Sequence, residues 1–170
     1  MPKTPDQFLA WLDDQGIPSH TTHHDAVATV AESQALRGTI AGLHAKNLFL
    51  KDKKSGLWLV VAEEERPIDL KALRKHIGAG NLSFAKPDVL MAHLGVTPGS
   101  VTPFAVINDT QNAVQVVLDQ ALSSAETVNF HPLTNTATTT LRGADLLRVL
   151  NLLAHTPLIV DLDVMVADPT

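Results

Sequence analysis

Cysteine is absent from all 170 residues of the chain. This excludes disulfide frameworks, thiolate zinc sites, iron–sulfur clusters and a cysteine nucleophile. Long apolar runs are missing too, because no segment approaches about 18 consecutive apolar residues. The opening residues, Met1 to Asp6, have no apolar stretch behind a basic end, as a secretory signal would. We therefore expect a cytoplasmic protein with no membrane partner.

Several motifs that carry known chemistry are also missing. The chain has no GxGxxG or GxxxxGKS/T phosphate loop, no GxSxG nucleophile elbow and no HExxH pair. A Rossmann or P-loop enzyme is therefore disfavoured. His20, His23 and His24 lie close together in an extended segment, whose alternating directions suit a surface better than a metal site. The other candidates for metal binding fall near expected helix ends, where imidazoles commonly contact the last carbonyls: His44, His76, His93 and His155.

Positive charge is in short supply, with 13 Lys and Arg against 18 Asp and Glu, a net charge of −5. A protein whose main task is to coat DNA or RNA needs clustered cations, so this balance argues against one and we expect no DNA partner. A local basic face remains compatible with it. The basic residues concentrate between the expected hairpin and the helices that follow: Lys51, Lys53, Lys54, Lys71, Arg74, Lys75 and Lys86.

The length and the 45% apolar content predict one domain, residues 1–163, followed by a loose tail, residues 164–170. Capping and periodicity signals predict helices over 5–15, 29–37, 70–77, 87–94 and 144–154, and strands over 47–51, 57–62, 104–107, 113–118, 127–130 and 138–141. Most connections are too short for βαβ crossovers. We therefore expect a mixed α/β (α+β) fold with a largely antiparallel or mixed central sheet surrounded by helices.

Two features stand out as candidates for chemistry. Lys46 and Asn47 place a cation and a carboxamide at the start of an apolar strand, although residue statistics alone favour a solvated strand edge there. The run from Gly95 to Phe104 holds two glycines and two prolines in ten residues, so its shape is restricted. Such a loop can direct successive N–H groups at one oxygen, but an ordinary rigid connector has the same composition.

Taken together and in order, five segments resemble the YbaK/ProX superfamily of aminoacyl-tRNA deacylases. They are Lys46-Asn47, the GxxxP loop Gly99–Pro103, Asn108-Asp109, Phe130-His131-Pro132 and the Thr-rich stretch Thr134-Asn135-Thr136. The superfamily consists of freestanding relatives of the editing domain inserted in bacterial prolyl-tRNA synthetase. The resemblance runs from the first expected helix to about Asp161. It is strongest to the freestanding alanine-specific branch, called ProXp-ala or PrdX.

This resemblance implies the YbaK-like editing-domain fold and a trans-editing hydrolase that deacylates mischarged Ala-tRNA(Pro). A synthetase pocket built for proline cannot strongly reject the smaller alanine, since a methylene is worth only about 1–3 kcal/mol, so a second sieve is needed. The implied partner is the acceptor end of tRNA(Pro), with prolyl-tRNA synthetase or an elongation factor as candidates for handing it over. The implied reaction is attack by water assisted by the neighbouring ribose hydroxyl, with no metal or cofactor required.

The resemblance also assigns site residues. Lys46 would hold the terminal phosphate or the developing oxyanion, and Asn47 would contact the substrate amine or a ribose hydroxyl. The substrate loop would supply the N–H groups of Ser100, Val101 and Thr102 to the scissile carbonyl, with Pro103 shaping the turn. The implied catalytic set is therefore Lys46, Asn47, Gly99, Ser100, Val101, Thr102 and Pro103. The implied substrate-binding set is Val30 on a pocket-wall helix, His131, Thr134 and Asn135, with His131 as a positioning group ahead of a base.

Two alternatives stay open on sequence grounds. A relative with the same loop and lysine but different pocket walls would deacylate another small mischarged aminoacyl-tRNA, carrying cysteine or serine. A domain that keeps the fold without catalysis would be a module that binds tRNA or a synthetase. The presence of Lys46, the full GxxxP loop and His131 favours an active enzyme. The sequence gives no indication of the oligomeric state.

Overall fold

The structure, a computed structural model, describes residues 1–26, 35–36, 38–54 and 56–162. Its strands form one mixed sheet in the order β1-β7-β6-β2-β3-β5-β8, with β4 paired to β2. Neighbours are antiparallel except for the parallel pairs β2/β6, β3/β5 and β5/β8. The strands are β1 His20–His23, β2 Leu43–Asp52, β3 Leu57–Glu63, β4 Leu82–Phe84, β5 Val114–Asp119, β6 Val128–Phe130, β7 Ala137–Leu141 and β8 Leu158–Val160. The expected mixed sheet is confirmed.

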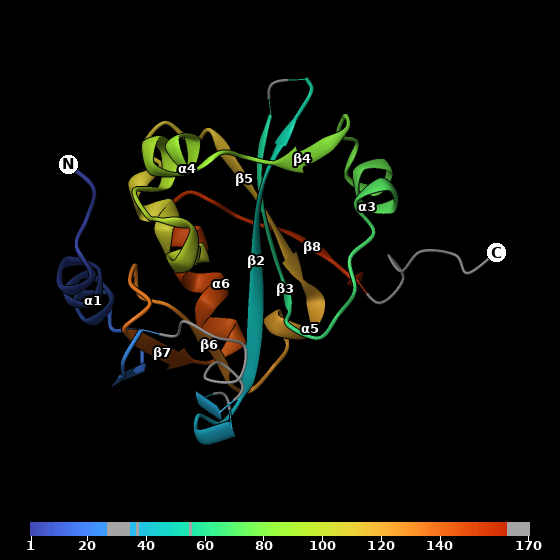
Figure 1. Cartoon of the computed structure of the whole chain (residues 1–170). Helices are drawn as coiled ribbons and strands as arrows, with labels where there is room; N and C mark the ends of the chain where they lie inside the picture. Colours follow the sequence, from blue (N-terminus) through green and yellow to red (C-terminus); the bar gives the residue numbers. More distant parts are fainter. Residues whose placement is uncertain (27–34, 37, 55, 163–170) are drawn as a thin grey trace.

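Helices cover both faces of this sheet (Figure 1). The helices α1, α4 and α6 lie on one side of the sheet and α3 lies on the other. The described helices are α1 Pro5–Asp14, α3 Leu70–Ile77, α4 Pro87–Leu94, α5 Gln120–Ser123 and α6 Gly143–Leu152, with the 3-10 helices η1 Pro98–Ser100 and η2 Pro103–Asn108. None of these helices is both long and apolar enough to cross a membrane.

The helix ends follow their local sequence signals. Thr4 and Gln7 form a reciprocal capping box at the start of α1, with N···O distances of 2.9 and 3.1 Å. The Asp69 carboxylate accepts the Lys71 N–H at the start of α3, and Gly78 ends that helix at φ 73°. The predicted bounds of α3 and α4 are therefore confirmed.

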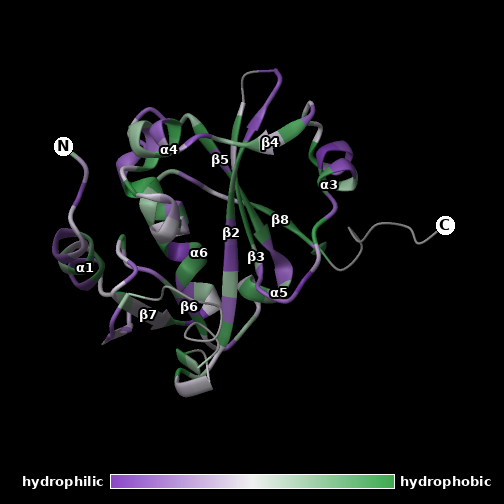
Figure 2. Ribbon diagram, in the orientation of Figure 1, coloured by the Kyte–Doolittle hydropathy of each residue, from purple (hydrophilic) through white to green (hydrophobic). Residues whose placement is uncertain are grey.

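Two apolar layers hold the sheet between the helices. The larger layer is centred on Phe8, Phe104 and Phe130, whose neighbouring ring centroids lie 4.7 and 5.7 Å apart. The smaller layer packs Leu50 and Val60 against Leu73 of α3. The central strands β3 and β5 contribute to both layers and are mostly green in Figure 2. A strand buried on both faces reads as a continuous apolar run, as β3 does from Leu57 to Ala62, whereas the exposed Gln115 interrupts the run of β5.

Some sequence expectations are wrong. Residues 104–107 form the 3-10 helix η2 instead of a strand, because Pro103 occupies its first position and the Thr102 side chain accepts the Phe104 N–H. The short strands β1, β4 and β8 were not predicted. The helix expected over 29–37 falls largely outside the described residues, and so does the tail 164–170.

Candidate functional site

Strand β2 changes partner along one of its edges. It pairs with β6 at Leu43 and His44, and with β4 only from Leu50 onward. At this edge Leu43 donates its N–H to Thr127, and the Phe49 carbonyl accepts the Ala85 N–H. Alternate residues face the same edge, so Ala45 and Asn47 also direct their N–H and C=O groups toward it. Since none of the described strands pairs with this stretch, β2 presents a short open edge.

The side chain of Asn47 lines a cavity of about 180 Å³ beside this edge. Its Oδ1 atom is buried and has no hydrogen-bond partner among the described residues. A buried acceptor without a donor costs about 1–3 kcal/mol, which is tolerated mainly where a ligand or water supplies the donor. The other lining residues are apolar: Phe49, Phe84, Ala85, Pro87, Leu90, Pro98 and Val101. Asn47 therefore supplies the polar side chain of an otherwise apolar cavity.

The GxxxP loop contributes Val101 to the lining of this cavity, and Pro98, the residue directly before the loop, lines it as well. Its first turn is the 3-10 helix η1, in which the Ser100 N–H donates to the Thr97 carbonyl oxygen at 2.9 Å. The expectation that Ser100 offers its N–H to a substrate is therefore wrong, because that donor is already used. Within the described residues, the N–H groups of Val101 and Thr102 have no hydrogen-bond partner. Two of the three expected donors remain available.

Asn135 lies against this loop from the other side. A Cβ placed on Gly99 would sit 3.4 Å from the Asn135 Nδ2 atom, which is ordinary van der Waals contact, so the Asn135 side chain packs beside this glycine. Thr134, by contrast, bonds to Thr136 at 3.0 Å and lines a separate hollow with Thr4 and other residues near α1. The structure thus brings Asn47, Gly99–Val101 and Asn135 together. Thr134, although it precedes Asn135 in the chain, lines a different pocket.

His131 follows β6 and is held by one hydrogen bond. Its Nδ1 lies 3.0 Å from the Ala137 carbonyl oxygen. That oxygen can only accept, so Nδ1 donates and Nε2 of the neutral ring is an acceptor. Burial lowers the pKa of His131 below its usual value near 6.5; the Ala137 bond opposes this, and the nearby His24 and His44 lower the pKa further. The ring is therefore neutral at pH 7.

The neighbours of His131 are His24 and His44, which the sequence predicts to be a surface histidine and a helix-end histidine. His24 lies in hydrogen-bond contact with Thr138, at 2.8 Å, and His44 sits on β2 with its Nε2 3.0 Å from the Ile40 carbonyl oxygen. No motif spacing links the three histidines, because strand pairing alone brings them together. Within the described ranges, no three His, Asp or Glu side chains are grouped so as to hold a metal ion.

Lys46 and Asn47 are adjacent on β2, so their side chains leave the strand on opposite faces. Lys46 pairs with Ala62 of β3 and shares its face with Leu48 and Leu50, whereas Asn47 shares its face with Phe49. The structure thus puts Lys46 in the same stretch of β2 as Asn47 but on the other face of the sheet, outside the cavity that Asn47 lines. Val30 lies outside the described residues.

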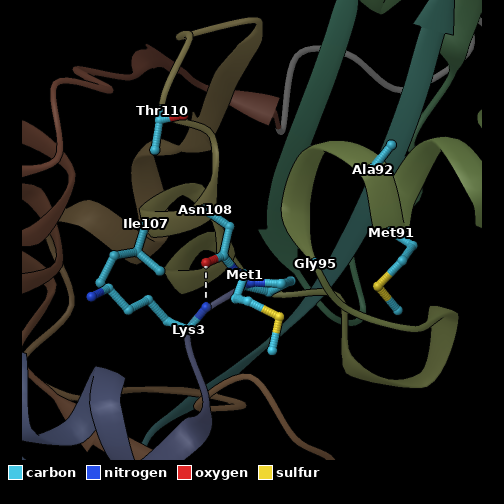
Figure 3. Close-up of a pocket in the computed structure, with 9 residues that line it drawn as sticks. Met1, Lys3, Met91, Ala92, Gly95, Ile107, Asn108 and Thr110 are labelled. Carbon is cyan, nitrogen blue, oxygen red and sulfur yellow. Dashed lines mark hydrogen bonds between the residues drawn. The ribbon is translucent and has the colours of Figure 1, made fainter.

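A larger pocket near the N-terminus contains none of the predicted site residues. It measures about 280 Å³ and is formed by residues 1–3 against the end of α4 and η2. Figure 3 shows its central contact, in which the Lys3 backbone N–H donates to the Asn108 side-chain oxygen at 2.8 Å. Asn108 in turn donates to the Leu94 carbonyl at 2.9 Å. These bonds give the Asn108-Asp109 segment a structural role in joining η2 to α4.

Phe84 is a cavity residue that sequence reasoning missed. It ends β4, a three-residue strand too short to leave a periodic signal, between two helices. The signal available was compositional: the chain has five phenylalanines and no tyrosine, and this one stands in the polar context Ser83 to Lys86. Its position outside the expected core elements was therefore the signal that could have singled out Phe84.

Comparisons with known proteins show the family of the chain. Residues 24–149 match the model of the aminoacyl-tRNA editing domain. The chain is 39% identical over 160 residues to "Prolyl-tRNA synthetase associated domain-containing protein 1" of Danio rerio, covering 93% of this chain and 85% of that protein. It is 39% identical over 142 residues to "Prolyl-tRNA editing protein ProX" of Acetoanaerobium sticklandii, covering 83% and 87%.

A solved structure shares the fold. It is described as a candidate trans-editing enzyme for prolyl tRNA synthetase, and it superposes with a TM-score of 0.71 at 19% identity over 95% of this chain and 98% of that one. The family-model match spans most of the sheet, including β2, the GxxxP loop and His131. The chain belongs to the aminoacyl-tRNA editing domain family, in the group associated with prolyl-tRNA synthetase.

Proposed function

We propose that this chain hydrolyses the ester bond of mischarged Ala-tRNA(Pro) in trans. The observation that carries the proposal is the buried, unpartnered Oδ1 of Asn47 in a cavity closed by Pro98 and Val101. An aminoacyl ester offers the groups that this site lacks, since its amine is a donor and its carbonyl oxygen is an acceptor. Family membership supports the same class of substrate.

The reaction follows from the available groups. With the ester at the open edge of β2, the substrate amine donates to Asn47 Oδ1, and the N–H groups of Val101 and Thr102 donate to the carbonyl oxygen. These donors stabilise the negative charge that develops on that oxygen when water attacks the carbonyl carbon. The bond to the ribose oxygen then breaks, and the proton lost by water passes to that oxygen, assisted by the neighbouring ribose hydroxyl. The products are free alanine and free tRNA.

Lys46 and His131 bind the parts of the substrate that adjoin the ester. The four-carbon stem of Lys46 lets its ammonium reach along the open edge to the phosphate of the terminal nucleotide. His131 is neutral, and its Nε2 accepts a hydrogen bond from a ribose hydroxyl or the substrate amine. A depressed pKa suits a positioning acceptor, because the ring does not repel the substrate ammonium at neutral pH.

Alanine is proposed as the amino acid because of the error that a proline enzyme cannot avoid. A pocket that holds proline also admits alanine, and the missing methylenes lower its affinity by only about 1–3 kcal/mol each. A separate hydrolytic site must then accept the smaller residue and exclude the larger. The names of the two curated relatives, which refer to prolyl-tRNA, point to the same tRNA.

The test is single-turnover hydrolysis of tRNA(Pro) charged in turn with alanine, cysteine, serine and proline. We expect rapid release of alanine and no release of proline. Lys46→Ala should lose most of the activity, whereas Lys75→Ala, which removes an exposed lysine on α3, should keep it. Selective release of cysteine or serine would refute the alanine assignment but keep the reaction. Failure to hydrolyse any of the four esters would refute the enzyme and favour a tRNA-binding module.

A further inference from the structure

Phe84 is the one phenylalanine of the chain that the fold leaves exposed. Its side chain is 63% exposed, whereas the other four, Phe8, Phe49, Phe104 and Phe130, are at most 5% exposed. A single exposed apolar residue is common on protein surfaces and needs no special explanation. The position of Phe84 is what distinguishes it, because this residue borders the cavity lined by Asn47 and Val101.

The strand pairing fixes Phe84 at the mouth of the candidate site. Phe84 pairs with Leu50 of β2, and the next residue, Ala85, donates its N–H to the Phe49 carbonyl. Phe84 therefore stands where the open edge of β2 ends. It shares a face of the sheet with its partner Leu50, it lines the edge of the cavity, and most of its side chain is exposed to solvent. A ligand that enters along the open edge toward Asn47 must pass it.

Two exposed lysines stand close to Phe84. Lys86 follows it by two residues in the chain, and Lys51 pairs with Ser83, so the Lys51 side chain leaves the sheet on the face opposite to Phe84. The acidic residue nearest in the strand pairing, Asp52, is buried and already accepts the N–H groups of Lys54 and Gly80 at 2.9 Å. The surface around Phe84 therefore combines an aromatic face with accessible positive charge, the combination that holds single-stranded nucleic acid.

We propose that Phe84 is a stacking platform for an unpaired nucleobase at the 3′ end of the tRNA, with Lys86 contacting the adjoining phosphate. This rests on the proposed function, because it places the last nucleotides of the substrate at the mouth while the ester reaches Asn47. Every base has a π face, so the platform holds the strand without reading its sequence. Its contribution is to binding, since the ring lies at the mouth and not at the reacting carbon.

The experiment uses an uncharged RNA oligonucleotide that ends in CCA, with 2-aminopurine in place of the terminal adenine. Stacking on an aromatic ring quenches this fluorophore, so the readout does not depend on hydrolysis. We expect quenching with the wild type and with Phe84→Trp. Phe84→Ala should lose the quenching and bind the oligonucleotide about 5- to 150-fold more weakly. Leu152→Ala, which removes another exposed apolar residue, on α6, should behave like the wild type.

Salt dependence and kinetics complete the test. Lys86→Gln should reduce the slope of log affinity against log salt by about 0.7, the value for one phosphate contact on a single strand. With charged tRNA, Phe84→Ala should raise the half-saturating enzyme concentration by the same factor and leave the maximal single-turnover rate nearly unchanged.

The outcomes separate this proposal from the proposed function. Suppose that the wild type hydrolyses Ala-tRNA(Pro), and that Phe84→Ala binds the oligonucleotide and the charged tRNA as tightly as the wild type does. The platform is then overturned while the enzyme stands. If the wild type hydrolyses no ester but quenching still depends on Phe84, the platform stands without the proposed reaction. Equal weakening in Phe84→Ala and Leu152→Ala also overturns the platform, since it would show a general loss of apolar surface.

Discussion

Asp109 and His155 form a buried pair that joins the end of η2 to the turn after α6. The carboxylate Oδ2 lies 2.8 Å from His155 Nε2 and also accepts the Val114 N–H at 2.8 Å, while Oδ1 accepts the Ala113 N–H at 3.1 Å. The other ring nitrogen of His155 donates to the Leu153 carbonyl oxygen at 2.7 Å. Because η2 follows directly from the GxxxP loop, this pair anchors the element that carries the loop.

Replacing Asp109 with alanine should destabilise the fold strongly. The substitution leaves two buried donors without a partner, the Val114 N–H and the His155 ring nitrogen. Each buried donor left unpaired costs about 1–3 kcal/mol, so we expect a loss of about 2–6 kcal/mol in the free energy of unfolding. In a domain of this size about 1 kcal/mol lowers the melting temperature by roughly 2–4 °C, so a loss near 4 kcal/mol lowers it by roughly 8–16 °C.

The assay is urea unfolding followed by far-UV circular dichroism, with linear extrapolation to zero urea. Asp109→Ala, His155→Ala and the double variant complete a cycle with the wild type. The double variant should lose less free energy of unfolding than the sum of the two single losses, by about 0.5–3 kcal/mol. Each single variant already loses the Asp109–His155 interaction, so the double variant cannot lose it twice. Additive costs, or a loss below about 1 kcal/mol for Asp109→Ala, would refute the reasoning from buried, unpaired donors.

Two further predictions concern pH. Burial lowers the pKa of His131. The neutral ring therefore contributes to stability above about pH 6.5, and this contribution is lost as the pH falls from there through the lowered pKa. Urea unfolding at a series of pH values should show this loss in the wild type and a flatter profile in His131→Gln. The Lys54 N–H, helped by that of Gly80, lowers the pKa of Asp52 below 3.8. Its stabilisation is therefore present above about pH 4 and is lost as the pH falls through the lowered pKa, so Asp52→Asn should flatten the acid-unfolding profile in that range.

Most of the secondary structure could be predicted because its signals are local. The capping box at Thr4, the Asp69 cap with Gly78, and the apolar runs of β2 and β3 each depend on residues close in sequence. The strand predicted over 104–107 is wrong, because this apolar run has the composition of a strand while Pro103 starts a 3-10 helix. Strands of three or four residues such as β4 and β8 form because long neighbours pair with them, and a short apolar run cannot reveal that.

The candidate site could be predicted only in part. The resemblance pointed to Asn47 and the GxxxP loop, and the structure brings Asn47 and that loop to one cavity. It did not reveal that the Ser100 N–H is used within η1, or that Lys46 leaves β2 on the opposite face from Asn47. Both facts depend on backbone bonding and strand alternation, which a motif does not encode. The open edge of β2 depends on where β6 stops and β4 begins, a property of the whole sheet.

The most direct test of the account compares stability and activity in Asn47→Leu. If the unpartnered oxygen of Asn47 is reserved for substrate, replacing it with an apolar side chain of similar size removes a buried unpaired acceptor. The variant should then unfold at an equal or higher urea concentration than the wild type, yet deacylate Ala-tRNA(Pro) at least 100-fold more slowly in single turnover, on the order of the loss of one substrate-positioning or oxyanion contact. Asn81→Ala, at an exposed asparagine, should match the wild type in both assays. Full activity in a folded Asn47→Leu protein would contradict the account.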